Sequence, residues 1–237
     1  DAVKHISFSF YKNWLKKLRE ETGKELFSVG EYWSNDLKKL NNYLEATNNS
    51  TSLFDVPLHF NFYNASISDS RYDLRELLKD TLVEDKPDLA VTFVDNHDSQ
   101  YGQSLESWVR EWFKPIAYGI ILLREKGYPC VFYGDLYGIE CQNIKKASSI
   151  EELIALRRDY AYGKENLYFD NEDVVGFTRE GDEEHTNSGL ATIFTNCDNE
   201  GEKEMYVGEK FAGATFYVYL GNVNEKVVID EKGYGLF

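Results

Sequence analysis

Apolar side chains recur with helical spacing along the first two thirds of the chain. Positions three and four apart share one face of a helix, so this spacing predicts helices that pack an apolar stripe against a core. Asn35 and Asp36 offer an N-cap for one of them, and Gly127 ends another. The predicted helices cover residues 10–18, 37–44, 73–78, 105–124 and 150–160.

Short apolar runs lie between these helices and predict strands. The clearest covers residues 89–94, whose near-continuous apolar character is typical of a parallel strand buried on both faces. Further strands are expected at residues 25–29, 53–60 and 129–133. This alternation of strand and helix indicates a parallel α/β architecture, in which functional groups lie on loops at the carboxyl ends of the strands.

The pattern changes after Tyr162 and Gly163 to short alternating segments separated by Gly, Asn and Asp. Such segments predict a small antiparallel β domain, with strands at residues 174–178, 191–194, 204–207 and 215–218. We therefore expect two domains, 1–162 and 163–237. The first supplies about half of the eight strands that a closed barrel needs, and half a barrel leaves strand edges and an apolar face open.

Composition limits the partners and the compartment. Asp and Glu number 41 against 26 Lys and Arg, which gives a net charge of −15, so nucleic acid and anionic membranes are poor partners. No apolar run is long enough to span a bilayer. The three cysteines, Cys130, Cys141 and Cys197, form no CxxC motif and favour a reducing compartment. A cytoplasmic location is therefore favoured over secretion.

Three carboxylates, those of Asp1, Glu31 and Asp98, stand where strands should end, and for Asp1 this is the end of a strand expected before Lys4. A retaining glycosidase needs one ionised carboxylate as nucleophile and one protonated acid beside the leaving oxygen. Carboxylates from successive strand ends therefore suggest a retaining glycosidase. Aromatic residues make up 15% of the chain, which suits sugar stacking as well as core packing.

The segments that hold these acids resemble three sequence regions of the α-amylase family, and the match is to bacterial liquefying-type enzymes. The segments are DAVKHI at 1–6, GEYW at 30–33 and FVDNHD at 93–98. The similarity continues through residues 54–59, 102–107, 131–135 and 160–163. It implies the C-terminal half of a (β/α)8 TIM barrel, followed by a small antiparallel β-sandwich domain.

The resemblance also implies the catalytic roles. Asp1 would be the nucleophile that forms a glycosyl-enzyme intermediate, and Glu31 would be the general acid and later the general base. Asp98 would bind sugar hydroxyls and stabilise the transition state. This division suits an oxocarbenium-like transition state, which needs negative charge on one face and a proton at the glycosidic oxygen.

Other residues of the same segments are implied to bind substrate. His97 matches a histidine that hydrogen-bonds the sugar beside the cleavage point, and Lys4 and His5 match residues on the leaving-group side. Tyr32 and Trp33 follow the general acid directly, where each either stacks on a glucose ring or packs in the core.

Calcium is implied by the resemblance alone. The principal site of the family uses the carbonyl that corresponds to His5, with ligands from an inserted domain that is missing from this sequence. A further calcium would join barrel and C-terminal domain through the carbonyls of Ser70 and Tyr72 and the carboxylate of Asp173. The chain departs from that set at Glu172, where relatives often have His, and at Asn196, where they have Asp.

The sequence thus predicts an endohydrolase of α-1,4-glucans such as starch, glycogen or maltodextrin. One alternative is an exo-acting maltooligosaccharide-forming or transglycosylating relative, since both reactions use the same covalent intermediate. Another is a non-catalytic glucan-binding half of a two-chain assembly. The arginine that precedes the nucleophile in relatives and an earlier acid-histidine region are missing. We therefore expect little activity from the isolated chain unless an N-terminal half or a second copy completes it.

Overall fold

Four parallel strands form the sheet that positions the predicted site. The computed structural model describes residues 3–198, 201–221 and 225–237, so the predicted nucleophile Asp1 lies outside the described residues. The strands follow the order β1 (Val29–Gly30), β2 (Ser52–Phe54), β3 (Ala90–Phe93) and β4 (Tyr128–Cys130). Each neighbouring pair is parallel, so the four carboxyl ends share one edge.

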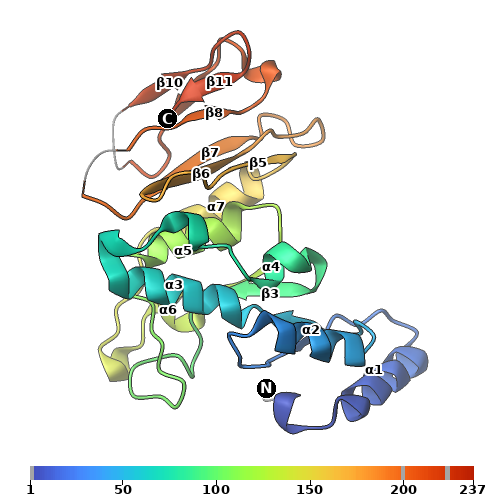
Figure 1. Cartoon of the computed structure of the whole chain (residues 1–237). Helices are drawn as coiled ribbons and strands as arrows, with labels where there is room; N and C mark the ends of the chain where they lie inside the picture. Colours follow the sequence, from blue (N-terminus) through green and yellow to red (C-terminus); the bar gives the residue numbers. More distant parts are fainter. Residues whose placement is uncertain (1–2, 199–200, 222–224) are drawn as a thin grey trace.

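Helices connect these strands and lie beneath the antiparallel strands in the view of Figure 1. The Asp36 carboxylate accepts a hydrogen bond from the Lys38 backbone N–H at 3.0 Å, so the predicted N-cap is confirmed. The helices are α1 (Phe8–Thr22), α2 (Leu37–Ala46), α3 (Val56–Ser68), α4 (Leu82–Asp85), α5 (Lys114–Leu123), α6 (Tyr133–Tyr137) and α7 (Ile150–Asp159), with 3-10 turns η1 (Val3–His5), η2 (Asp69–Arg71), η3 (Leu74–Glu76), η4 (Pro87–Leu89) and η5 (Glu140–Gln142).

The helix predicted over residues 105–124 is wrong in its first half. It begins only at Lys114, and Pro115 occupies its first turn. Proline is tolerated there but would break the interior of a longer helix. The preceding residues instead bond to the loop after β3, where the Ser107 N–H donates to the Ser99 carbonyl at 3.0 Å.

Four other predicted elements also differ. Of the strand expected at residues 25–29, only Val29 lies in a strand, where β1 begins. Residues 56–60 begin α3 rather than continue a strand, because the Asp55 carboxylate caps the helix and accepts from the Leu58 N–H at 3.1 Å. The strand expected at residues 129–133 ends at Cys130 and gives way to α6. The helix expected at residues 73–78 is the 3-10 turn η3.

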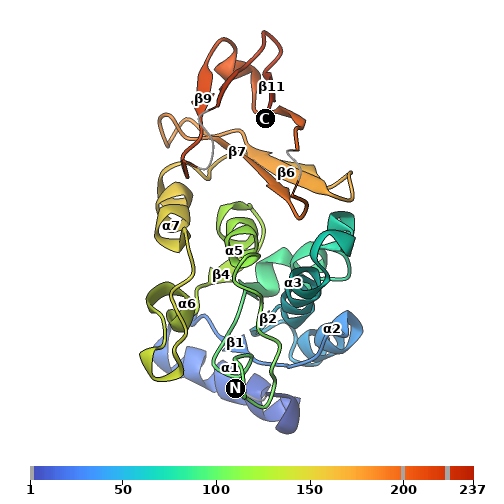
Figure 2. The ribbon, with the colours of Figure 1, turned by 90° about the vertical axis from the view of Figure 1, so that its left-hand side faces the viewer.

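The last third of the chain is antiparallel. β5 (Glu165–Tyr168), β6 (Val174–Arg179) and β7 (Leu190–Thr195) form one sheet, which lies against α5 and α7 in Figure 2. Two strand pairs stand beyond it, β8 (Glu204–Tyr206) with β11 (Tyr234–Leu236) and β9 (Thr215–Tyr217) with β10 (Lys226–Val228). The four predicted strands are confirmed, whereas β5, β10 and β11 had not been predicted.

The α/β part and the antiparallel part share one hydrophobic core. Val175 and Phe177 of β6 belong to the same buried cluster as Ala117 and Ile120 of α5. The buried Arg124 side chain adds polar contacts, since it donates to Glu84 at 2.8 Å and to Glu165 at 2.9 Å. No helix among the described residues is long and apolar enough to cross a membrane.

Gly163 sits where the chain passes from α7 to β5, and we expect it to tolerate no side chain. It has a φ of +76°, and a Cβ atom there would lie 2.1 Å from the Gly181 carbonyl oxygen. Gly163→Ala should therefore lower the free energy of unfolding by about 2–4 kcal/mol in urea titrations. Gly213→Ala is the matched control, because Gly213 has the same φ with nothing within 4 Å. It should cost about 1 kcal/mol, and equal losses in the two variants would contradict the steric explanation.

Candidate active site

Glu31 directly follows β1 and is 9% exposed, at the carboxyl edge of the parallel sheet. The 3-10 turn η1 is hydrogen-bonded to the residues that follow β1. The Val3 N–H donates to the Glu31 carbonyl at 3.0 Å, and the Lys4 ammonium donates to the Trp33 carbonyl at 3.0 Å. The structure thus brings Lys4, Glu31 and Trp33 together, while the His5 side chain is exposed on η1 beside them.

His59 links the end of β1 to the end of β3, and sequence reasoning did not assign it to the site. Its buried ring stacks on Phe93 with centroids 5.1 Å apart and lies 5.3 Å from the Trp33 ring. Nδ1 is 2.6 Å from the Val94 carbonyl, and Nε2 is 2.7 Å from the Ser107 hydroxyl. Burial lowers the pKa of His59 to about 4, so the ring is neutral at pH 7 and Nδ1–H donates to the carbonyl.

The loop after β3 holds Asp98 in a fixed turn. The Asn96 side-chain oxygen accepts from the backbone N–H groups of Asp98 and Ser99, both at 2.9 Å. The Ser99 hydroxyl in turn donates to the Asp95 carboxylate at 2.8 Å. His97 Nε2 lies 3.6 Å from Asp98 Oδ1, and their side chains are 76% and 31% exposed. The predicted pair is therefore adjacent and accessible from the edge of the sheet.

A buried cluster of Lys114, Asp95 and Asp135 contacts the loop after β3. The Lys114 ammonium lies between two carboxylates, 3.4 Å from Asp95 Oδ2 and hydrogen-bonded to Asp135, with the Trp108 ring 3.2 Å away. The Tyr118 hydroxyl donates to Asp135 at 2.6 Å. Burial raises the pKa of both Asp95 and Asp135, and the Lys114 charge opposes that rise. The available signal for this cluster was Lys114 itself, the one charged residue of α5.

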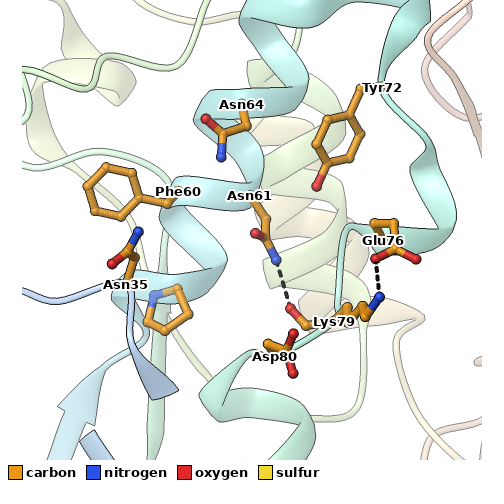
Figure 3. A pocket seen from close by; sticks show the side chains of 9 residues that line it. Asn35, Phe60, Asn61, Asn64, Tyr72, Glu76, Lys79 and Asp80 are labelled. Carbon is orange, nitrogen blue, oxygen red and sulfur yellow. Dashed lines mark hydrogen bonds and ion pairs between the residues drawn. The ribbon is translucent and has the colours of Figure 1, made fainter. Parts of the chain in front are cut away.

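A polar depression of about 360 Å³ lies between α3 and the loop after η3, and neither Glu31 nor Asp98 lines it. Figure 3 shows the Asn61 side chain directed toward Lys79, whose carbonyl it contacts, and Glu76 paired with the Lys79 ammonium. The Asn61 amide thus helps to hold the loop after η3, and of the predicted site residues only Tyr72, a predicted calcium ligand, lines the depression.

The residues predicted for a second calcium lie at the junction of the two parts. Ser70 is on η2, the Tyr72 carbonyl accepts a hydrogen bond from the Asn196 carboxamide at 2.7 Å, and Asp173 immediately precedes β6. Calcium needs six to eight oxygen ligands. The Asn196 side chain turns its N–H group, and not an oxygen ligand, toward the Asp69 and Tyr72 carbonyls, so this arrangement does not fit the ion. The described parts of the chain also gather no group of three or more His, Cys, Asp or Glu side chains able to hold a metal.

The chain is similar to known proteins over its whole length. The family described as Alpha-amylase C-terminal matches residues 190–237. Over its whole length the chain is 54% identical to an α-amylase of Geobacillus stearothermophilus and 53% identical to one of Bacillus licheniformis. The chain is homologous to the carboxyl-terminal part of bacterial α-amylases. It covers 43% and 47% of these two relatives, and 50% of the cytoplasmic α-amylase of Escherichia coli (strain K12), at 41% identity.

The chain therefore spans about half the length of these α-amylases. A solved structure also has a similar fold over the whole of this chain, which again matches only part of the longer protein. The γ-CGTase of alkalophilic Bacillus clarkii aligns with the whole chain at a TM-score of 0.67 and 18% identity, and the chain covers 38% of that enzyme.

Proposed function

We propose that the chain forms the carboxyl-terminal half of a retaining α-amylase that cleaves α-1,4 bonds within starch, glycogen or maltodextrins. In this proposal β1 to β4 are four of the eight strands of a (β/α)8 barrel. Residues 1–162 complete that half, and residues 163–237 form a β-sandwich domain. The observation that carries the proposal is the placement of Glu31 and the Asp98 loop at one edge of a parallel sheet, at the ends of β1 and β3.

Each carboxylate has a separate task in the proposed reaction. Asp1 attacks the anomeric carbon while Glu31 protonates the departing glycosidic oxygen, and Glu31 then takes a proton from the water that releases the sugar. Asp98 binds sugar hydroxyls and adds negative charge near the oxocarbenium-like transition state. The turn built on Asn96 holds the main chain of Asp98 in position before substrate binds.

Four neighbouring side chains are proposed to hold the glucan. Lys4 and His5 line the leaving-group side, and His97 donates to the sugar beside the cleavage point. Trp33 presents a ring that is partly exposed and is backed by His59. An aromatic face with such rigid backing suits stacking on glucose.

The proposed partner is the amino-terminal half of the barrel, or a second copy that takes its place. Among the described strands, β1 and β4 each have a neighbour on one side only. α1 also leaves large apolar side chains in solvent, with Phe8, Phe10 and Trp14 each about half exposed. Open strand edges and exposed aromatics are features that a covering half would bury. A calcium ion at the His5 carbonyl would take its remaining ligands from that half.

Starch hydrolysis by the 237-residue chain, alone and fused, tests the proposal. The fusion carries the amino-terminal part of the Geobacillus stearothermophilus α-amylase ahead of this chain. We expect reducing ends to be released from soluble starch by the fusion and almost none by the chain alone. Circular dichroism and size exclusion confirm that both are folded. Full activity of the isolated chain, or none from a folded fusion, would contradict the proposal.

A second candidate is exo-acting cleavage that releases short maltooligosaccharides of one length. It is favoured by the 50% identity of the chain to a glucan 1,4-α-maltohexaosidase of Bacillus sp. (strain 707). Product chromatography separates the candidates. Random shortening of starch indicates endohydrolysis, a single early product indicates exo-action, and longer glucans indicate transglycosylation.

A further inference from the structure

One buried side-chain amide connects the antiparallel part to the main chain around η2. Asn196 directly follows β7 and is 8% exposed. Its Nδ2 group donates to the Tyr72 carbonyl at 2.7 Å and to the Asp69 carbonyl at 3.3 Å. The two N–H bonds of one carboxamide thus satisfy two main-chain oxygens about 125 positions away along the chain.

Two carbonyl oxygens that converge on one point need a positive partner, which is either a cation or an N–H donor. The carboxamide supplies the N–H donors without a net charge. The reversed rotamer would turn the Asn196 side-chain oxygen toward the same two carbonyls, and only a cation between them would stabilise three converging oxygens. The Cys197 thiol lies 3.7 Å from that oxygen, as a weak donor on its other side.

Other protein groups complete this junction. The Leu74 N–H donates to the Glu172 carbonyl at 2.8 Å, so this carbonyl is also occupied by a main-chain donor. The Arg75 guanidinium lies 3.6 Å from the Glu172 carboxylate and pairs with Asp73. Positive charge and N–H donors therefore already face the oxygens on both sides of the contact, at η2 and in the loop before β6.

We propose that the Asn196 carboxamide occupies the position of a cation, and that this junction is held together without a metal ion. The proposal concerns the joining of the two parts and does not depend on catalysis. It predicts that one change of atom, from the amide nitrogen to an oxygen in Asn196→Asp, converts the junction into one that needs calcium.

Thermal unfolding of the 237-residue chain in EDTA and in millimolar Ca²⁺ tests this proposal. The variants are Asn196→Asp, Asn196→Ala and the control Asn42→Asp, which makes the same charge change on the exposed face of α2. In EDTA we expect Asn196→Ala and Asn196→Asp to lower the Tm by about 3–8 °C, because two buried carbonyls lose their donors. Asn42→Asp should leave the Tm almost unchanged.

The change in Tm on adding calcium then distinguishes a junction held by the amide from one that binds the ion. We expect wild type and Asn196→Ala to show the same calcium-induced change in Tm, whatever its size, and Asn196→Asp alone to gain several degrees more. A larger calcium gain in wild type than in Asn196→Ala would overturn the proposal, because the amide oxygen would then be a ligand. An Asn196→Ala variant as stable as wild type in EDTA, or an Asn196→Asp variant without the additional gain, would also overturn it.

Discussion

Glu31→Gln should slow starch hydrolysis by the fused enzyme about 10²–10⁴-fold, because glutamine has the shape of the acid but no proton to deliver to the leaving oxygen. Glu31 is nearly buried at the end of β1, and its main-chain carbonyl accepts from Val3. That backbone contact is unchanged in the variant, so the fold and the position of the side chain should persist. The loss should therefore appear in kcat, with KM for maltooligosaccharides changed much less.

Glu152→Gln is the control for this prediction, because it makes the same substitution at an exposed position of α7. Its activity should equal that of the unmodified fusion. If Glu31→Gln retains most of its kcat, another group supplies the proton and the proposed role of Glu31 is wrong.

Lys114→Met should lower the free energy of unfolding by about 3–5 kcal/mol, since it leaves buried carboxylates without their counter-ion. The Lys114 side chain is 1% exposed and lies against Asp95 and Asp135, whose side chains are 0% and 1% exposed. Methionine fills a similar volume, so packing explains little of the loss. Urea titration of the variant and wild type measures the difference. Lys38→Met, at an exposed position on α2, should change the free energy by less than about 0.5 kcal/mol.

The pH dependence of this loss identifies its cause. Burial raises the pKa of Asp95 and Asp135 in the folded state, and removal of Lys114 takes away the charge that opposes the rise. The folded variant therefore binds protons more tightly than the unfolded chain, and its stability falls as the pH rises. The deficit should be largest near pH 7 and smaller near pH 5. Adding Asp135→Asn to Lys114→Met should recover part of it, whereas a deficit independent of pH would indicate a packing defect.

Local signals in the sequence were sufficient for much of the fold. The alternation of helix and strand predicted the parallel part. The Asp36 cap and the strand predicted over residues 89–94, observed as β3 (Ala90–Phe93), were correct because each depends on nearby residues. The errors also had local causes. Pro115 marks where α5 begins, and Asp55 followed by Val-Pro marks the start of α3, yet apolar periodicity alone extended a helix and a strand across these positions.

Contacts between distant segments could not be predicted in the same way. His59 is 35 positions from the Val94 carbonyl that it holds, and Lys114 is 21 positions from Asp135. Nothing in a single sequence pairs such residues, because the pairing depends on how strands and helices pack. The sequence therefore indicated which acids follow the strands, and the structure adds the neutral histidine and the buried ion cluster that support them.

The central claim is that Glu31 and Asp98 belong to a retaining α-glucan hydrolase, and the anomeric form of the first product tests it most directly. Proton NMR of maltooligosaccharide cleavage by the fused enzyme, recorded before mutarotation, distinguishes the two anomers. Double displacement through Asp1 predicts that the α-anomer accumulates first. A β-anomer as the first product would contradict the account, because it would require direct attack by water.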